Sequence, residues 1–276
     1  MDERLDRIAS MANQIAYEGR DLDEYIDGAP HIKHESLREL YGRLVLEVFD
    51  AAKESTDSPV VADLGAGEGG VTLPFLELGA QVVAVDISSS QLAALKSKAQ
   101  GRSDQLDARC QDIHDFLKEE DASYDIVAVN AFLHHIPDYL SLIRRAVSLL
   151  KPGGVFFSFQ DPLRYDTVGF ANRALTDTGY FFWRLSGGAK GDVLGGIYRR
   201  ARRKFGVYHD DSKSDNAEYH VVRNGVDQEA IANLLVELGC ECRVVRYYSS
   251  QNTLFQKLGE KLGLENVFGV VAKRPR

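Results

Sequence analysis

Residues 60–70 read VVADLGAGEGG, an apolar run that leads directly into a cluster of glycines. A short run with β-branched residues predicts a buried strand. Glycines after a strand indicate a tight turn, because a residue without a Cβ adopts positive φ and lets the backbone approach a ligand closely. A helix after such a turn would direct its N-terminal N–H groups at that ligand. The stretch therefore predicts a strand, a turn and a helix, with a binding site at the turn.

Strands and helices continue to alternate beyond this stretch. Further strands are expected at QVVAVD, 107–111, YDIVAVN, VFFSFQ, CECRVVRYY and VFGVVAKR. Helices are expected at 71–78, 88–99, 113–119, 138–150, 227–238 and 253–262, after two amphipathic helices at 3–17 and 34–53. This alternation predicts βαβ units and a parallel sheet. We expect an α/β fold with a Rossmann-like, seven-stranded, mainly parallel sheet, helices on both faces, an N-terminal helical lid and an inserted cap.

The composition is that of an ordinary globular protein, with 44% hydrophobic and 27% charged residues. A formal net charge of −8 argues against a nucleic-acid partner, which would require a broad basic surface. Apolar runs are interrupted within about ten residues, far short of the roughly 20 that a transmembrane span requires. The N-terminus lacks the basic and apolar regions of a secretory signal, so we expect a cytoplasmic location.

The three cysteines, Cys110, Cys240 and Cys242, favour reduced packing residues over a disulfide, because their number is odd and two of them share an expected strand. A structural zinc site takes four Cys or His ligands, and the C-x-C pair lacks nearby partners. We therefore expect no metal site.

The glycines alone leave two alternatives open. Gly65, Gly67 and Gly70 satisfy the G-x-G-x-x-G pattern of dinucleotide-binding proteins, and a plain turn with extra glycines is also compatible. Asp86 ends the second strand, where a carboxylate accepts hydrogen bonds from ribose hydroxyls in several nucleotide cofactors. After the third strand, the segment 111–113 places polar groups beside an apolar one, which suits an adenine amino group and ring face.

Taken together, five motifs resemble those of the class I S-adenosylmethionine-dependent methyltransferases, in the branch often called type 11. They are DLGAGEG, VVAVDIS, QDI, YDIVAVNAFLHHIPD and LLKPGG. The resemblance is strong over 59–160 and looser over 227–273, and it implies an antiparallel last strand at VFGVVAKR. It also implies a set of residues that bind S-adenosylmethionine, namely Asp63, Gly65, Gly67, Asp86, Ile87, Gln111, Asp112, Ile113 and Asn130.

Within this set, the resemblance implies that the two glycines contact the methionine part of the cofactor and Asp86 the ribose. Asp112 and Ile113 would contact the adenine, and Asn130 the methionine side. An NAD-dependent Rossmann enzyme is the alternative that the glycine pattern leaves open. A noncatalytic cofactor-binding or interaction module on the same fold is another, since a fold does not prove turnover.

Candidate catalytic groups follow the fourth and fifth strands. His134 and His135 lie at the carboxyl edge of the sheet, and an imidazole with a pKa near neutrality suits a general base; a packing role is the alternative for both. A distant resemblance to phosphoethanolamine methyltransferases pairs His134 with an N-terminal tyrosine, here Tyr25. Asp161 follows the fifth strand and is expected either to contact the acceptor or to cap a turn.

Four segments are expected: 1–57 as a helical lid, 58–161 as the cofactor-binding core, 162–222 as an inserted acceptor-binding cap, and 223–276 as the C-terminal part of the sheet. The cap contains aromatics beside a cluster of cations, Arg199, Arg200, Arg202, Arg203 and Lys204. These could receive a large anionic or aromatic acceptor, or lie at a membrane surface bearing a lipid-linked substrate. A small or medium-sized metabolite fits best as the acceptor, because a deep pocket under two covering segments suits a metabolite. A solvated helix face is the alternative. The sequence leaves the acceptor and the oligomeric state open.

Overall fold

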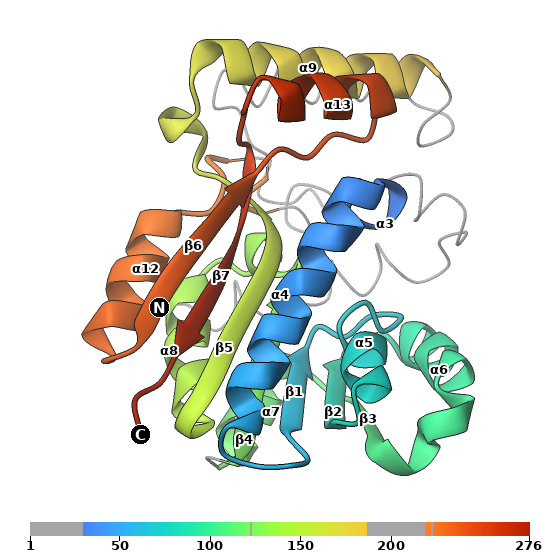
Figure 1. The fold of residues 1–276 in the computed structure, drawn as a ribbon, viewed down its shortest axis with the longest axis vertical. Coiled ribbons are helices and arrows are strands. Elements are labelled where there is room, and N and C mark those ends of the chain that lie inside the picture. The colour runs from blue at the N-terminus through green and yellow to red at the C-terminus, as the bar shows by residue number, and fades with distance from the viewer. Residues whose placement is uncertain (1–29, 122, 187–218, 222) are drawn as a thin grey trace.

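The computed structural model describes residues 30–121, 123–186, 219–221 and 223–276. They include one seven-stranded sheet, whose strands run through the middle of Figure 1. The strand order is β3-β2-β1-β4-β5-β7-β6. The strands are β1 (Val60–Leu64), β2 (Gln81–Asp86), β3 (Leu106–Cys110), β4 (Tyr124–Asn130), β5 (Leu150–Pro162), β6 (Glu241–Tyr247) and β7 (Val267–Lys273). Pairs among β1 to β5 are parallel, whereas β7 is antiparallel to both neighbours. The expected Rossmann-like sheet with an antiparallel last strand is confirmed.

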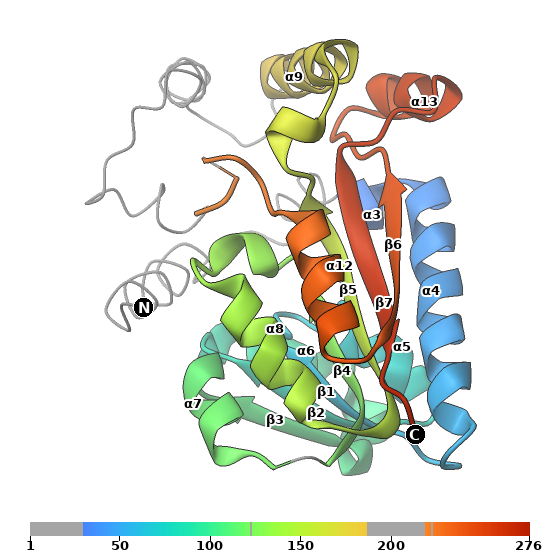
Figure 2. The ribbon, with the colours of Figure 1, turned by 90° about the vertical axis from the view of Figure 1, so that its left-hand side faces the viewer.

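Helices cover both faces of the sheet, as Figure 2 shows. One face carries α4 (Glu35–Lys53), α5 (Thr72–Glu77) and α6 (Ser89–Lys98). The other carries α7 (Ile113–Glu119), α8 (Tyr139–Ser148) and α12 (Gln228–Glu237). Four short helical segments lie between these elements in the chain: α3 (Pro30–Lys33), η1 (Gln100–Gln105), η2 (Leu133–His135) and η3 (Tyr165–Thr167). Within the expected lid segment, α4 packs on the sheet through a buried apolar stripe that belongs to its core.

Several helices begin directly after a residue whose side chain caps them. This explains why the helix boundaries expected from the sequence lie close to the observed ones. The carboxylates of Asp138 and Asp227 accept N–H bonds from the first turns of α8 and α12. Each such cap stabilises a helix by about 1 kcal/mol. These two caps therefore determine the residue at which each helix begins.

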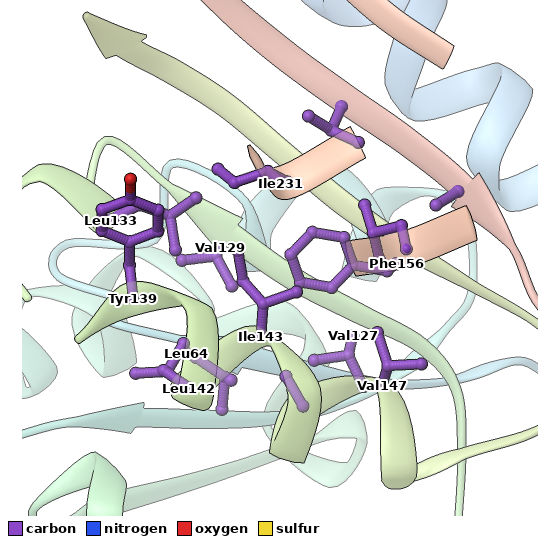
Figure 3. Close-up of a cluster of buried hydrophobic side chains, with 14 of the residues drawn as sticks. Leu64, Val127, Val129, Leu133, Tyr139, Leu142, Ile143, Val147, Phe156 and Ile231 are labelled. Carbon is purple, nitrogen blue, oxygen red and sulfur yellow. The ribbon is translucent and has the colours of Figure 1, made fainter. Parts of the chain in front are cut away.

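The larger core cluster lies between the sheet and the α8 and α12 face (Figure 3). Phe156 of β5 and Val129 of β4 are fully buried against Ile143 of α8 and Ile231 of α12. Burial of one such side chain contributes roughly 1.5 to 3 kcal/mol. The strands thus form a rigid platform beneath the loops at their carboxyl ends.

Two helices pack together beyond one end of the sheet, α9 (Phe170–Leu185) and α13 (Thr253–Lys261), as Figures 1 and 2 show. A Cβ added at Gly179 of α9 would lie 2.9 Å from the Cβ of Phe255, so the absence of a side chain permits this crossing. The sequence predicted α13 but not α9. This helix lies in the segment interpreted as an inserted cap; only its Gly179 and Trp183 are buried, and it packs on α13, which is distant in the sequence.

The three cysteines are unpaired, as expected. Burial raises the pKa of Cys240, and it raises the pKa of Cys242 to about 11, so both are inert packing thiols at neutral pH. Among the helices in the described ranges, each is too short or too polar to cross a bilayer. Over these same ranges, His, Cys, Asp and Glu side chains form no group of three that could hold a metal ion.

Candidate active site

The glycine turn joins β1 to α5. Gly65 has φ +78° and Gly67 has φ +51°, both in the region that favours glycine. The N–H of Gly65 donates to the carbonyl of Val85 at 2.9 Å, which ties the turn to β2. A Cβ at position 65 would lie 2.5 Å from Cδ2 of Phe132, in the loop after β4. The turn therefore fits closely against two neighbouring strand ends.

This contact makes Gly65→Ala a sharp test of the turn. The added methyl group meets the Phe132 ring and forces a strained φ, so we expect the free energy of unfolding to fall by about 2 to 4 kcal/mol. Gly79→Ala is the matched control, because Gly79 has φ +90° but no atom within 4 Å of an added Cβ. That variant should lose only about 1 kcal/mol. Equal losses in urea titrations would contradict a close contact at Gly65.

Asp86 lies at the end of β2, beside the glycine turn. Its Oδ2 accepts from the N–H of Gly67 at 2.9 Å, and its Oδ1 accepts from the N–H of Ser88 at 2.8 Å. Burial raises the pKa of this carboxyl, although the N–H donors oppose the effect. Each carboxylate oxygen keeps a second lone pair for a further donor. The group is therefore placed to accept from hydroxyls of a ligand that lies over the turn.

Asp63, one residue before the end of β1, is almost completely buried. Its Oδ2 accepts from the hydroxyl of Thr72 at 2.6 Å, whereas its Oδ1 has no hydrogen-bond partner in the described ranges. Burial raises the pKa of Asp63 to about 7; the Thr72 hydroxyl opposes this shift and the charge of Asp86 adds to it. A carboxyl group that titrates near neutral pH thus lies at the start of the glycine turn.

The raised pKa has a consequence for stability. The folded protein holds a proton on Asp63 between pH 3.8 and about 7, where the unfolded chain releases it. The native state binds more protons in this window, so its stability falls as pH rises through it. Asp63→Asn should remove this loss. We expect the unfolding free energy of the variant, relative to wild type, to rise by about 2 to 4 kcal/mol from pH 4 to pH 8. A constant difference in urea titrations would contradict the shift.

The segment 111–113, which is expected to bind adenine, directly follows the end of β3. Asp112 caps α7, since its Oδ1 accepts from the N–H of His114 at 2.8 Å, and Ile113 is buried. The Gln111 amide donates to Glu119 at 2.7 Å. The carbonyl of Ile87 accepts from the Cys110 thiol at 3.6 Å, which links the ends of β2 and β3. Roles for these residues in cofactor binding stay predictions.

Asn130 ends β4, opposite the glycine turn. Its Nδ2 lies 3.6 Å from the position of a Cβ on Gly70, and its Oδ1 is buried with no hydrogen-bond partner in the part of the chain that the structure describes. A buried amide oxygen without a donor is unfavourable by about 1 to 3 kcal/mol. A ligand that donates an N–H or O–H here would remove that penalty.

His134 lies in η2, directly after β4, and contacts Asp161 at the end of β5. Both its backbone N–H and its Nδ1 are within hydrogen-bonding distance of Asp161 Oδ1, at 3.1 Å and 2.8 Å. The His135 ring is buried, with its centre 3.9 Å from that of His134 and its edge against Phe132. The His134 ring thus contacts a carboxylate, and the His135 ring packs against two aromatic rings.

Not every expected site residue can be placed. Tyr25 and the basic cluster at 199–204 lie outside the described residues, so their predicted roles stay untested. The pairing of His134 with Asp161 was not predicted. The two residues are 27 positions apart, and a register shift in β5 between Ser158 and Asp161 decides which way Asp161 faces. The one sequence signal for a role of Asp161 was its place after an expected buried strand and before a proline.

A family comparison agrees with this geometry. Residues 62–158 match the family model described as "Methyltransferase domain". Over these residues the chain is similar to that domain. The matched region runs from β1 to β5 and includes the glycine turn, Asp86, Asn130 and His134.

Similar proteins extend the comparison. Ubiquinone biosynthesis O-methyltransferase from Xanthomonas campestris pv. campestris (strain B100) is 36% identical over 109 residues, which are 40% of this chain and 46% of that protein. The chain thus matches about half the length of these curated relatives.

Two solved structures share the fold of this chain. Magnesium protoporphyrin IX methyltransferase from Synechocystis PCC 6803 with bound S-adenosylmethionine has a TM-score of 0.54 and 14% identity, covering 96% of this chain and 97% of that one. A putative sarcosine dimethylglycine methyltransferase from Galdieria sulphuraria has a TM-score of 0.54 and 15% identity, covering 99% of both chains.

Proposed function

We propose that this protein is an enzyme that transfers a methyl group from S-adenosylmethionine to oxygen or nitrogen of a small or medium-sized metabolite. The observation that carries the proposal is the contact between the Gly67 N–H and the Asp86 carboxylate at 2.9 Å. It joins a backbone-lined turn to a carboxylate that would accept from ribose hydroxyls, at the edge where open α/β sheets bind ligands.

The residues at this edge fit the cofactor. Asp86 would accept from the ribose hydroxyls, and the turn at Gly65 and Gly67 would lie against the methionine part. The orphaned Oδ1 atoms of Asp63 and Asn130 fit a ligand rich in N–H donors, such as the ammonium group of that methionine part. Asp112 and Ile113 would hold the adenine. When bound, S-adenosylmethionine supplies an electrophilic methyl group on a sulfonium sulfur.

The acceptor must present a lone pair in line with that methyl group. His134 would take the proton from an acceptor hydroxyl or ammonium group, and the sheet platform would hold both partners in place. The names of similar proteins support a small acceptor, since they include an O-methyltransferase of ubiquinone biosynthesis and a methyltransferase of magnesium protoporphyrin IX.

The finer features of the proposal rest on the sequence. An acceptor of anionic or aromatic character is favoured by the cations at 199–204, and the segment 162–222 would cover it as a cap. The proposed location is cytoplasmic. A noncatalytic module on the same fold is the competing function.

Two measurements test the proposal. Calorimetry with S-adenosylhomocysteine should show binding, and titration with NAD should not. Incubation with methyl-labelled cofactor and a metabolite extract should then yield a labelled product that mass spectrometry identifies. Binding of NAD alone would overturn the cofactor assignment. Binding of S-adenosylhomocysteine without transfer to any extract would favour the noncatalytic module.

A further inference from the structure

The carboxylate of Asp161 is fully buried, with a side-chain exposure of 0%. Its Oδ1 contacts both the backbone N–H and Nδ1 of His134. Its Oδ2 is buried and has no hydrogen-bond partner among residues 30–121, 123–186, 219–221 and 223–276. A buried carboxylate that uses half of its acceptor capacity is unfavourable, so its position requires an explanation.

The backbone holds Asp161 in this position through a strained residue. Gln160 has φ +68°, a conformation that is uncommon for a residue other than glycine. The hydroxyl of Tyr247 on β6 accepts from the Gln160 N–H at 2.9 Å, and the Gln160 amide donates to Ser249 at 3.0 Å. The register shift in β5 at the same place turns the Asp161 side chain toward η2. Strain that neighbouring groups maintain is typical of functional sites.

This contact selects one tautomer of His134. A carboxylate only accepts hydrogen bonds, so Nδ1 of His134 carries the proton that points at Asp161 Oδ1. In the neutral ring the lone pair is therefore on Nε2, the nitrogen away from the carboxylate. The negative charge of Asp161 also favours the protonated imidazolium, because charges interact strongly in a buried environment. The Oδ2 atom without a donor strengthens the preference for the imidazolium form, because a positive charge on His134 offsets the buried negative charge of Asp161.

Other charged and titratable groups face this pair. His135 lies against the His134 ring at 3.9 Å. The N–H of His220 donates to the His134 carbonyl at 2.8 Å, and burial lowers the pKa of His220, so that ring is neutral at pH 7. Arg223 lies over the Tyr219 ring beside His220. Across the sheet, the charge of Asp161 helps raise the pKa of Tyr247, after burial. Asp161 is in direct contact with His134, with 2.8 Å between its Oδ1 and Nδ1 of the ring.

We propose that Asp161 is a positioning residue that fixes the Nδ1–H tautomer of His134 and raises its basicity, so that Nε2 serves as the base for acceptors that carry a hydroxyl or ammonium proton. This inference rests on the proposed methyl transfer. The acceptor proton passes to Nε2 of His134 while the acceptor lone pair bonds to the methyl carbon. The electrons of the former carbon–sulfur bond stay on sulfur, and Asp161 keeps its charge throughout.

The test follows His134 by NMR in the full chain. In wild type, long-range ¹H–¹⁵N spectra should show the Nδ1–H tautomer of the neutral ring, with His134→Gln used to assign the signals. Asp161→Asn should lower the pKa of His134 by about 1 unit or more, as expected when an opposite charge in contact is removed. Asp138→Asn is the matched control, because Asp138 caps α8 through the Ser141 N–H. It should leave the pKa of His134 unchanged.

Each outcome decides a separate point. An Nε2–H tautomer in wild type would overturn the proposal even if Asp161→Asn fails to fold. An unchanged His134 pKa in folded Asp161→Asn would reduce Asp161 to a cap of η2. Binding of S-adenosylhomocysteine, measured on the same samples, tests the proposed function independently: its absence in wild type contradicts methyl transfer, whatever the tautomer.

Discussion

His134→Ala is expected to lower kcat by about 10² to 10⁴, the usual contribution of a general base, while S-adenosylhomocysteine still binds. The measurement requires the acceptor that the labelling experiment identifies. Wild-type kcat should fall as pH drops through the pKa of His134, because the protonated ring no longer accepts a proton. The variant should lack this inflection.

His135→Gln provides the comparison for this prediction. His135 is adjacent and buried, and its ring packs against Phe132 and His134. The pH inflection should survive in that variant even if stability falls. A loss below tenfold in His134→Ala with the wild-type pH profile would show that the acceptor needs no base and that positioning alone drives the transfer.

Asp86→Ala is expected to weaken S-adenosylmethionine binding by about 1.5 to 3 kcal/mol, the range for hydrogen bonds to a charged group. This corresponds to roughly a 10- to 150-fold higher Kd. The variant removes the acceptor for the ribose hydroxyls and leaves the N–H groups of Gly67 and Ser88 without their present partner.

A surface carboxylate on the neighbouring strand provides the control. Asp107 of β3 is largely exposed and pairs with Arg109, so Asp107→Ala should leave the Kd unchanged. Calorimetry on both variants, with melting curves to check folding, distinguishes the two residues. An unaltered Kd in folded Asp86→Ala would remove Asp86 from the cofactor site.

The sequence predicted the positions of Asp63, Asp86 and Asn130 well for a physical reason. Each ends or nearly ends a strand, and the carboxyl ends of parallel strands lie along one edge of the sheet. Strand identity therefore suffices to bring these side chains together. The capping of α7 by Asp112 is equally local, since it involves a backbone N–H two residues away.

Contacts that depend on irregular backbone could not be predicted from the sequence. The pairing of His134 with Asp161 requires a register shift in β5 and a positive φ at Gln160, and neither has a local signature. The helix α9 lies in the segment interpreted as a cap, and it packs on α13, which is distant in the sequence. In both cases the contacts join residues that are far apart along the chain.

The position of β7 between β5 and β6 also affects how the protein is made. A nascent chain emerges from its N-terminus, so the edge strand β6 is synthesised before the inner strand that joins it to the sheet. Until residues 267–273 emerge, β5 presents an open edge and β6 has no neighbour in the sheet. Open edges pair readily with other chains. Slow translation between β6 and β7 would therefore prolong the interval in which neighbouring nascent chains can aggregate.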